Sequence, residues 1–236
     1  MKIIQYFDRL NAEVQQIYAS TVASEAPSIA LVHAFVCDLK DFSQIIEDKG
    51  ERELVQVVCS QFEASALEMS FGLYRQSFSS LRRAFETALA VLYFSLNKLE
   101  HYEWLRDAGD INWQSMIDPD SGALSVRGAN ALWPEILPQI QDVNRRSRNL
   151  YRTLSQYVHG NKETWDLSGL KISKNDFMIS RYFEYAKEAE EILCVGFIVR
   201  YVEAWSQGKS DQAQALIERV SHISIIREKI GGPRDI

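Results

Sequence analysis

Helix-breaking residues are scarce in this chain of 236 residues. It contains 5 prolines and 11 glycines, and several of them fall in one stretch, 107–138. Proline removes a backbone donor and glycine tolerates unusual backbone angles, so their scarcity elsewhere leaves most of the chain free to form helices. Internal repeats and low-complexity tracts are also lacking. With 46% apolar and 25% charged residues, the sequence predicts a folded, all-α protein.

Cysteines are few and widely separated. Cys37, Cys59 and Cys194 include no pair at the close spacing of a zinc ribbon or a redox motif. We interpret them as reduced core thiols of a cytoplasmic protein. His33 and Cys37 are four residues apart and could present two zinc ligands, but no second pair of ligands has matching spacing, which favours core packing. We expect no metal and no cofactor.

Long hydrophobic runs are missing. The longest, Ala88–Phe94, is far below the roughly 20 residues that a membrane span needs. The N-terminus reaches Asp8 and Arg9 too soon for the apolar region of a signal peptide. We therefore expect a cytoplasmic chain without membrane contact. Several common catalytic motifs are lacking too: there is no Walker loop, no GxGxxG, no GxSxG and no Glu-x-x-His element.

Excess positive charge is also absent. The formal net charge is −6 and the pI is near 5.3, which argues against a broadly basic surface for nucleic acid. A local basic patch remains compatible with this balance.

Apolar residues at three- and four-residue steps predict several amphipathic helices. Helices over 3–22 and 28–46, the second ended by Gly50, predict an N-terminal helical hairpin over 1–49. The region 51–99 indicates two helices, or one bent helix, with a break at Gly72.

The second half of the chain contains fewer but longer patterns. We expect an insertion of loops and short helices over 107–138, a helix over 139–159, and a small hairpin or irregular loop over 161–174. Asn175 can cap a further helix, and a last helix is expected over 210–230. The predicted organisation is one domain, 1–236, with a helical core over 50–206 and a C-terminal helix and tail over 208–236.

The helix over 139–159 carries a basic stretch and a histidine. Arg152 and His159 are two helical turns apart and share one face, with Ser155 between them. Histidine can take a proton from a 2′-hydroxyl near neutral pH, while a guanidinium stabilises charge at phosphorus, so this pair suits metal-independent cleavage of RNA. The candidate phosphate-binding residues are Arg145, Arg148 and Asn149.

Two elements of the chain resemble the HEPN superfamily of helical bundles. One is Arg152-Thr-Leu-Ser-Gln-Tyr-Val-His159, an arginine and a histidine with six residues between them. The other is a pair of elements found in HEPN-like bacterial families: Arg82-Arg-Ala-Phe-Glu86, and the helix end Tyr151 to His159-Gly160. The resemblance covers about residues 50–205. Catalytic members commonly have Asn, Asp or His directly after the arginine, and this chain has Thr153.

The resemblance implies an up-down helical bundle and a metal-independent endoribonuclease of the toxin or phage-defence kind. Arg152 and His159 would be catalytic, with Arg82, Glu86, Ser155 and Tyr151 in support. It also implies a homodimer with a composite site, and an antitoxin or a neighbouring regulatory protein as a further partner. The alternative is a non-catalytic HEPN-like module that binds a nucleotide, an RNA or a protein partner.

Each of these residues also has a purely structural interpretation. His159 could simply be favoured at a helix C-terminus by the helix dipole. Arg145 and its neighbours could form a solvated face paired with Asp142, and Arg82 with Glu86 could be an ordinary pair four residues apart. Under this interpretation the motif is coincidental. The tryptophans in or beside the insertion could line a groove for bases or could cover the core under its loops.

Overall fold

The computed structural model describes residues 2–159, 172–206 and 210–233. Every regular element in these ranges is helical, which confirms the predicted all-α class. The longer helices are α1 (Ile3–Phe42), α2 (Lys49–Ser70), α3 (Tyr74–Leu96), α7 (Leu137–His159) and α8 (Asp176–Arg200). The shorter ones are η1 (Ser43–Ile45), α4 (Lys98–Leu105), α5 (Trp113–Met116), α6 (Val126–Leu132), η2 (Pro134–Ile136), α9 (Val202–Ser206), α10 (Ser210–Glu218) and α11 (Ser224–Lys229).

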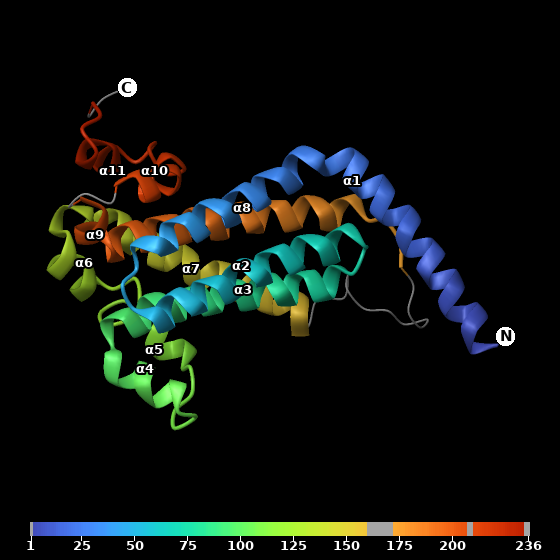
Figure 1. Ribbon diagram of the computed structural model, residues 1–236, viewed down its shortest axis with the longest axis horizontal. Helices are drawn as coiled ribbons and strands as arrows, with labels where there is room; N and C mark the ends of the chain where they lie inside the picture. Colours follow the sequence, from blue (N-terminus) through green and yellow to red (C-terminus); the bar gives the residue numbers. More distant parts are fainter. Residues whose placement is uncertain (1, 160–171, 207–209, 234–236) are drawn as a thin grey trace.

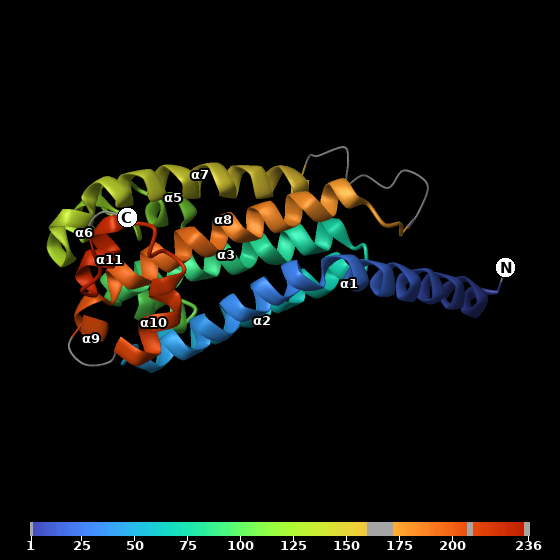
Figure 2. The same cartoon turned by 90° about the horizontal axis from the view of Figure 1, so that it is seen from above.

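Four helices, α2, α3, α7 and α8, form the central bundle (Figure 1). The helices α2 and α7 run in one direction, and α3 and α8 run in the other (Figures 1 and 2). The helix α3 contacts the other three. The C-terminal part of α1 packs along the length of α2, and its N-terminal part projects beyond the bundle (Figure 2).

The core is densest where α3 and α8 run side by side. Every residue of 88–95 and of 192–199 is buried, so both helices are surrounded on all sides there. Gly196 allows this close approach: a Cβ at that position would lie 2.6 Å from Leu92 Cδ1. Full burial explains why these stretches are the most apolar in the chain and carry little helical alternation.

The predicted N-terminal helical hairpin is wrong. Residues Ile3–Phe42 form one helix with Pro27 inside it, and Figure 1 shows this helix bending near its middle. An internal proline removes one backbone hydrogen bond and kinks a helix. No glycine lies in 23–27 to reverse the chain, so the kink does not become a turn.

The helical break at Gly72 is confirmed. Gly72 has a φ of 75° and separates α2 from α3, a left-handed conformation that favours glycine. The predicted boundary at Gly50 is wrong, because Gly50 lies inside the first turn of α2. Asp48 caps that helix instead: its side chain accepts a hydrogen bond from the Glu51 amide at 3.0 Å.

The insertion over 107–138 consists of loops with α5, α6 and η2, as predicted. Asn175 caps α8 by accepting from the Met178 amide, also as predicted. The single last helix over 210–230 is wrong, because a turn divides it into α10 and α11. This turn allows both Val220 and Ile226 to be fully buried. The hairpin or loop predicted for 161–174 falls largely outside the described residues.

Two features of α1 differ from the expectations. Cys37 is exposed, as is His33, so the core interpretation holds for Cys59 and Cys194 but not for this pair. The stretch Ile3–Ile45 is long and apolar enough to cross a membrane by length and composition, and 22% of its most apolar window is buried in the structure. Core helices and signal sequences pass the same test, so cytoplasmic location stays a prediction.

Candidate functional site

The predicted site residues of α7 lie on two sides of that helix. Tyr151 and Ser155 are half-buried and face the bundle, whereas Arg152 and His159 are exposed. The Ser155 hydroxyl donates to the Tyr151 carbonyl at 2.7 Å, a hydrogen bond within the helix that leaves this hydroxyl occupied.

Arg82, from α3, joins two of these side chains. Its Nη1 lies 3.1 Å from His159 Nε2, and its Nη2 donates to the Tyr151 hydroxyl at 2.5 Å. The guanidinium also lies over the Tyr151 ring, 4.7 Å from the centroid, at a distance typical of a cation–π contact. We call Arg82, Tyr151 and His159 the histidine cluster.

The chemistry of the histidine cluster fixes the state of its imidazole. A guanidinium has donors and no acceptor, so His159 Nε2 must supply a lone pair in this hydrogen bond. The imidazole therefore acts as the acceptor at Nε2, and its proton lies on Nδ1. The Tyr151 oxygen likewise accepts from Arg82, which leaves the Tyr151 proton available for another acceptor.

The insertion supports this cluster from one side. The Trp113 ring, from α5, stacks on the Tyr151 ring with centroids 3.4 Å apart and planes 14° apart. Tyr151 is thus held between an arginine and a tryptophan. The Arg82 Nε is buried and has no hydrogen-bond partner among the residues that the structure describes, so the guanidinium is oriented chiefly by its two Nη contacts and the ring.

The other predicted residues do not join the cluster. Within the described part of the chain, Arg152 and Glu86 make no hydrogen bond or ion pair, and Arg82 does not pair with Glu86. Arg152 and His159 are both exposed, and the contact that the structure shows with His159 comes from Arg82, which the sequence analysis gave a supporting role. A partner 77 residues away in the sequence leaves no local pattern.

The basic stretch of α7 is divided in the same way. Arg145 pairs with Asp142, and Arg146 pairs with Glu188 and Glu191 of α8 at 3.3 and 3.0 Å. Arg148 and Asn149 are exposed. The structural interpretation therefore holds for the first two arginines and leaves Arg148 and Arg152 as exposed cations.

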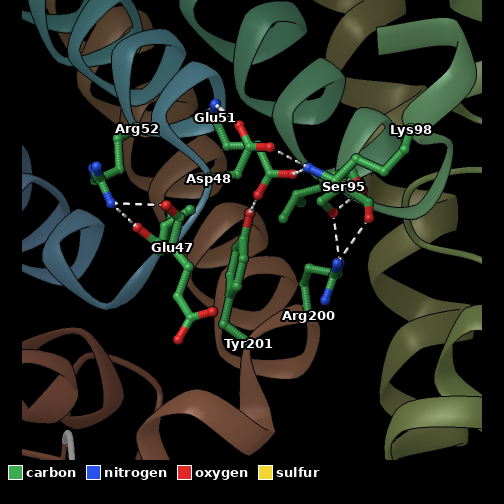
Figure 3. A network of polar contacts seen from close by, with 10 residues as sticks. Glu47, Asp48, Glu51, Arg52, Ser95, Lys98, Arg200 and Tyr201 are labelled. Carbon is green, nitrogen blue, oxygen red and sulfur yellow. Dashed lines mark hydrogen bonds and ion pairs between the residues drawn. The ribbon is translucent and has the colours of Figure 1, made fainter. Parts of the chain in front are cut away.

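A second polar site, which the sequence analysis missed, lies at the far end of α3. Figure 3 shows Lys98 pointing toward Asp48 and Glu51, and Tyr201 meeting Glu51 from below. Lys98 Nζ donates to Asp48 Oδ2 at 2.8 Å and to Glu51 Oε1, and the Tyr201 hydroxyl donates to Glu51 Oε2 at 2.6 Å. These residues line a cavity of about 730 Å³, which we call the carboxylate pocket.

Arg200 completes one wall of the carboxylate pocket. Its Nε donates to the Ser95 hydroxyl at 2.5 Å and its Nη2 to the Ser95 carbonyl at 2.8 Å. This carbonyl lies one residue before the end of α3, so the arginine satisfies a helix-end acceptor that has no partner within the helix.

Burial and pairing set the charges in the carboxylate pocket. Burial raises the pKa of Asp48, but hydrogen bonds from Lys98 and the Glu51 amide outweigh it and lower the pKa overall. Burial lowers the pKa of Lys98, but its hydrogen bonds to Asp48 and Glu51 raise it overall. Burial, followed by the charge of Glu51, raises the pKa of Tyr201 well above its ordinary value. Asp48 and Lys98 are charged at neutral pH, and Tyr201 keeps its proton.

Comparison with known proteins finds no matching family model, no matching curated protein and no matching solved structure. The function is therefore argued from the two polar sites themselves.

Proposed function

We propose that the histidine cluster is the active site of a metal-independent endoribonuclease. The observation that carries this proposal is the 3.1 Å contact between Arg82 Nη1 and His159 Nε2. It places a neutral imidazole, able to act as a base, beside a cation that can hold a phosphate, and His159 is exposed to solvent.

The reaction follows from the donors and acceptors of the cluster. An RNA phosphate would compete with His159 for the Arg82 donors, which frees the Nε2 lone pair to take the proton of the adjacent 2′-hydroxyl. The 2′-oxygen then bonds to phosphorus and the bond from phosphorus to the 5′-oxygen breaks. The products are a 2′,3′-cyclic phosphate and a 5′-hydroxyl, whose proton comes from an acid.

Two groups can complete this site. The Tyr151 proton is free to bind a phosphate oxygen, because the Tyr151 oxygen already accepts from Arg82. Arg152, two turns before His159 on the same helical face, adds an exposed cation for the RNA backbone. In a homodimer, as the HEPN resemblance implies, the second copy of the site supplies the acid that protonates the leaving oxygen.

The test is cleavage of total RNA by the purified full-length chain in excess EDTA. Wild type should cleave, and His159→Ala and Arg82→Ala should each lose cleavage by at least about a hundredfold, within the range of general acid–base contributions. Arg145→Ala is the matched control on the same helix, since Arg145 already pairs with Asp142. Cleavage that His159→Ala retains would overturn the proposal. Light scattering on each sample records whether it is a dimer.

A second candidate function is a non-catalytic module that binds a nucleotide, an RNA or a protein partner. The observation that favours it is that Arg82 already uses both Nη groups, on His159 and Tyr151, and Thr153 departs from the catalytic pattern. Fluorescence anisotropy with a labelled RNA separates the two functions: binding by wild type without cleavage, weakened by Arg82→Ala, supports the module. Under either function an antitoxin or a neighbouring regulatory protein would act by covering this surface.

A further inference from the structure

Two acidic residues of the carboxylate pocket, Asp48 and Glu51, lie close to a third potential metal ligand, His101. Asp48 caps α2, Glu51 lies in its first turn, and His101 lies on α4. One ligand atom from each lies within 4.8 Å of the other two. Three ligands on one ion, each at about 2.1 Å, lie roughly 3.0–3.6 Å from one another, so the widest pair of these ligand atoms would need to close by at most about 2 Å.

His101 gives an independent indication of a missing ligand. It is 1% exposed, and neither Nδ1 nor Nε2 has a hydrogen-bond partner in the described part of the chain. A neutral imidazole has one N–H donor and one nitrogen that accepts a hydrogen bond. Leaving a buried polar group of this kind without a partner costs roughly 1–3 kcal/mol. Metal coordination would use the Nε2 or Nδ1 lone pair and remove part of this cost.

The packing around His101 holds the ring in place. The ring stacks on Phe94, with centroids 5.1 Å apart and planes 8° apart. Gly50 lies against its other side: a Cβ there would be 3.1 Å from His101 Cε1. Burial lowers the pKa of His101 despite the attraction of Asp48, so the imidazole is neutral at pH 7, the form that binds metals.

A positive charge already stands between the two carboxylates. Lys98 Nζ contacts both Asp48 and Glu51, and its side chain is 41% exposed, so it can turn outward into solvent. The pocket is lined by four carboxylates, from Glu47, Asp48, Glu51 and Glu203, against two cations, from Lys98 and Arg200. The surplus of negative charge favours an additional cation.

We propose that Asp48, Glu51 and His101 bind one divalent transition-metal ion, and that Lys98 competes with this ion for the two carboxylates. One imidazole and two carboxylates form a ligand set that suits Mn²⁺, Fe²⁺ or Zn²⁺, whereas Mg²⁺ and Ca²⁺ bind oxygen ligands. The Tyr201 hydroxyl, which donates to Glu51 Oε2, orients the glutamate from outside the ligand set.

This site is separate from the histidine cluster. Arg82 and Ser95 are 13 positions apart on α3, or about 20 Å along a helix axis. The metal would therefore stabilise the structure or bind a ligand at this end of the bundle. The RNA cleavage assay in EDTA tests the histidine cluster and does not test the metal site.

The probe is Mn²⁺, because manganese binds thiols weakly and so avoids the exposed Cys37. Chelator-treated full-length protein is titrated with MnCl₂, and free Mn²⁺ is followed by electron paramagnetic resonance. Wild type should bind one ion per chain. Lys98→Met, which keeps the length of the side chain and removes its charge, should bind at least about tenfold more tightly.

Two further variants separate this site from adventitious binding. His101→Phe keeps an aromatic ring on Phe94 and removes both nitrogens, so it should bind at least about tenfold more weakly. His33→Gln is the control: His33 lies beside Cys37 and Glu63, a second place where a histidine meets further ligand types, and its loss should leave the affinity unchanged. Circular dichroism confirms that each variant is folded.

Three outcomes would overturn the proposal. One is no binding by either wild type or Lys98→Met. Another is equal affinity in wild type and His101→Phe, which would place the ion elsewhere. The third is binding by Lys98→Met alone, which would show that the native lysine permanently fills the site.

Discussion

Two polar clusters along α3 have opposite character. At Arg82, near the middle of the helix, α3 meets an exposed histidine and a half-buried tyrosine. Beyond Ser95 the chain meets Glu51, which is 2% exposed and held by a lysine and a tyrosine. The carboxylate pocket has more hydrogen bonds than the histidine cluster, and it holds a carboxylate almost entirely out of water. We expect the carboxylate pocket to govern stability and the histidine cluster to govern reactivity.

The largest effect on stability is expected at Glu51. Glu51→Ala leaves the buried Tyr201 hydroxyl without its acceptor and removes one of the two anions on Lys98. The free energy of unfolding should fall by about 3 kcal/mol, at the lower end for a broken buried pair because Lys98 can reach solvent. Urea denaturation at pH 7 measures it. Glu53→Ala, which removes an exposed ion pair with Lys49, is the control. An equally small loss in Glu51→Ala would contradict the expected role of the carboxylate pocket in stability.

A second buried carboxylate, Glu190 of α8, should respond to pH. Burial raises the pKa of Glu190 to about 7, despite Arg219, from an ordinary value of 4.5. A raised pKa in the folded state stabilises the fold below pH 4.5, and this contribution is lost as pH rises through about 7. As the pH rises from 4.5 to about 7, the free energy of unfolding of wild type should therefore fall by roughly 3 kcal/mol more than that of Glu190→Gln.

The measurement for Glu190 is a series of urea denaturation curves at pH values across this window. Parallel pH profiles for wild type and Glu190→Gln would show that Arg219, whose Nη1 lies 3.4 Å from Glu190 Oε2, compensates the burial fully. Other groups that titrate in the window contribute equally to both proteins, so the difference between the profiles isolates this carboxylate.

A smaller effect is expected at Arg82. Arg82→Ala removes two hydrogen bonds and the contact with the Tyr151 ring, but it also removes the buried Nε that has no partner. We expect a net loss of about 1 kcal/mol. Nitrogen-15 NMR of His159 at neutral pH should show Nδ1 protonated and Nε2 bare in wild type, and a mixture of tautomers in the variant. A protonated Nε2 in wild type would contradict the hydrogen bond from Arg82 to His159.

The smallest effect on stability is expected at His159 itself. His159→Ala should change the free energy of unfolding by no more than about 0.5 kcal/mol, as is usual for an exposed position. Thermal and urea denaturation measure this change on the same sample used for RNA cleavage. A loss above about 2 kcal/mol would mean that His159 stabilises the fold. The expected difference in role between the histidine cluster and the carboxylate pocket would then be wrong.

Local patterns predicted much of the fold. Amphipathic spacing located α2, α3, α7 and α8, Gly72 located the turn between α2 and α3, and the insertion followed from its prolines and glycines. The misses were at Pro27, at Gly50, which lies inside α2, and around 219–223. At Pro27 a helix continues through a breaking residue; at 219–223 a turn interrupts a helical pattern so that apolar side chains on both sides reach the core.

The candidate sites were less predictable. Arg82 and Tyr151 were predicted to support His159, and the structure brings the three side chains together. The phosphate role of Arg152 stays a prediction. Two arginines at suitable positions cannot be ranked until the packing of α3 on α7 is known. Glu86 was predicted from the resemblance to HEPN-like families, and no contact of this side chain within the described residues supports it.

The sequence by itself determined the helical class, the main helices and the presence of a histidine at the end of α7, because periodicity, breakers and caps act within a few residues. Only the tertiary structure decided which arginine meets His159 and that Glu51, Lys98 and Tyr201 meet at all. Glu51 and Tyr201 are 150 residues apart, and contacts over such separations depend on how the helices pack, which no local pattern encodes.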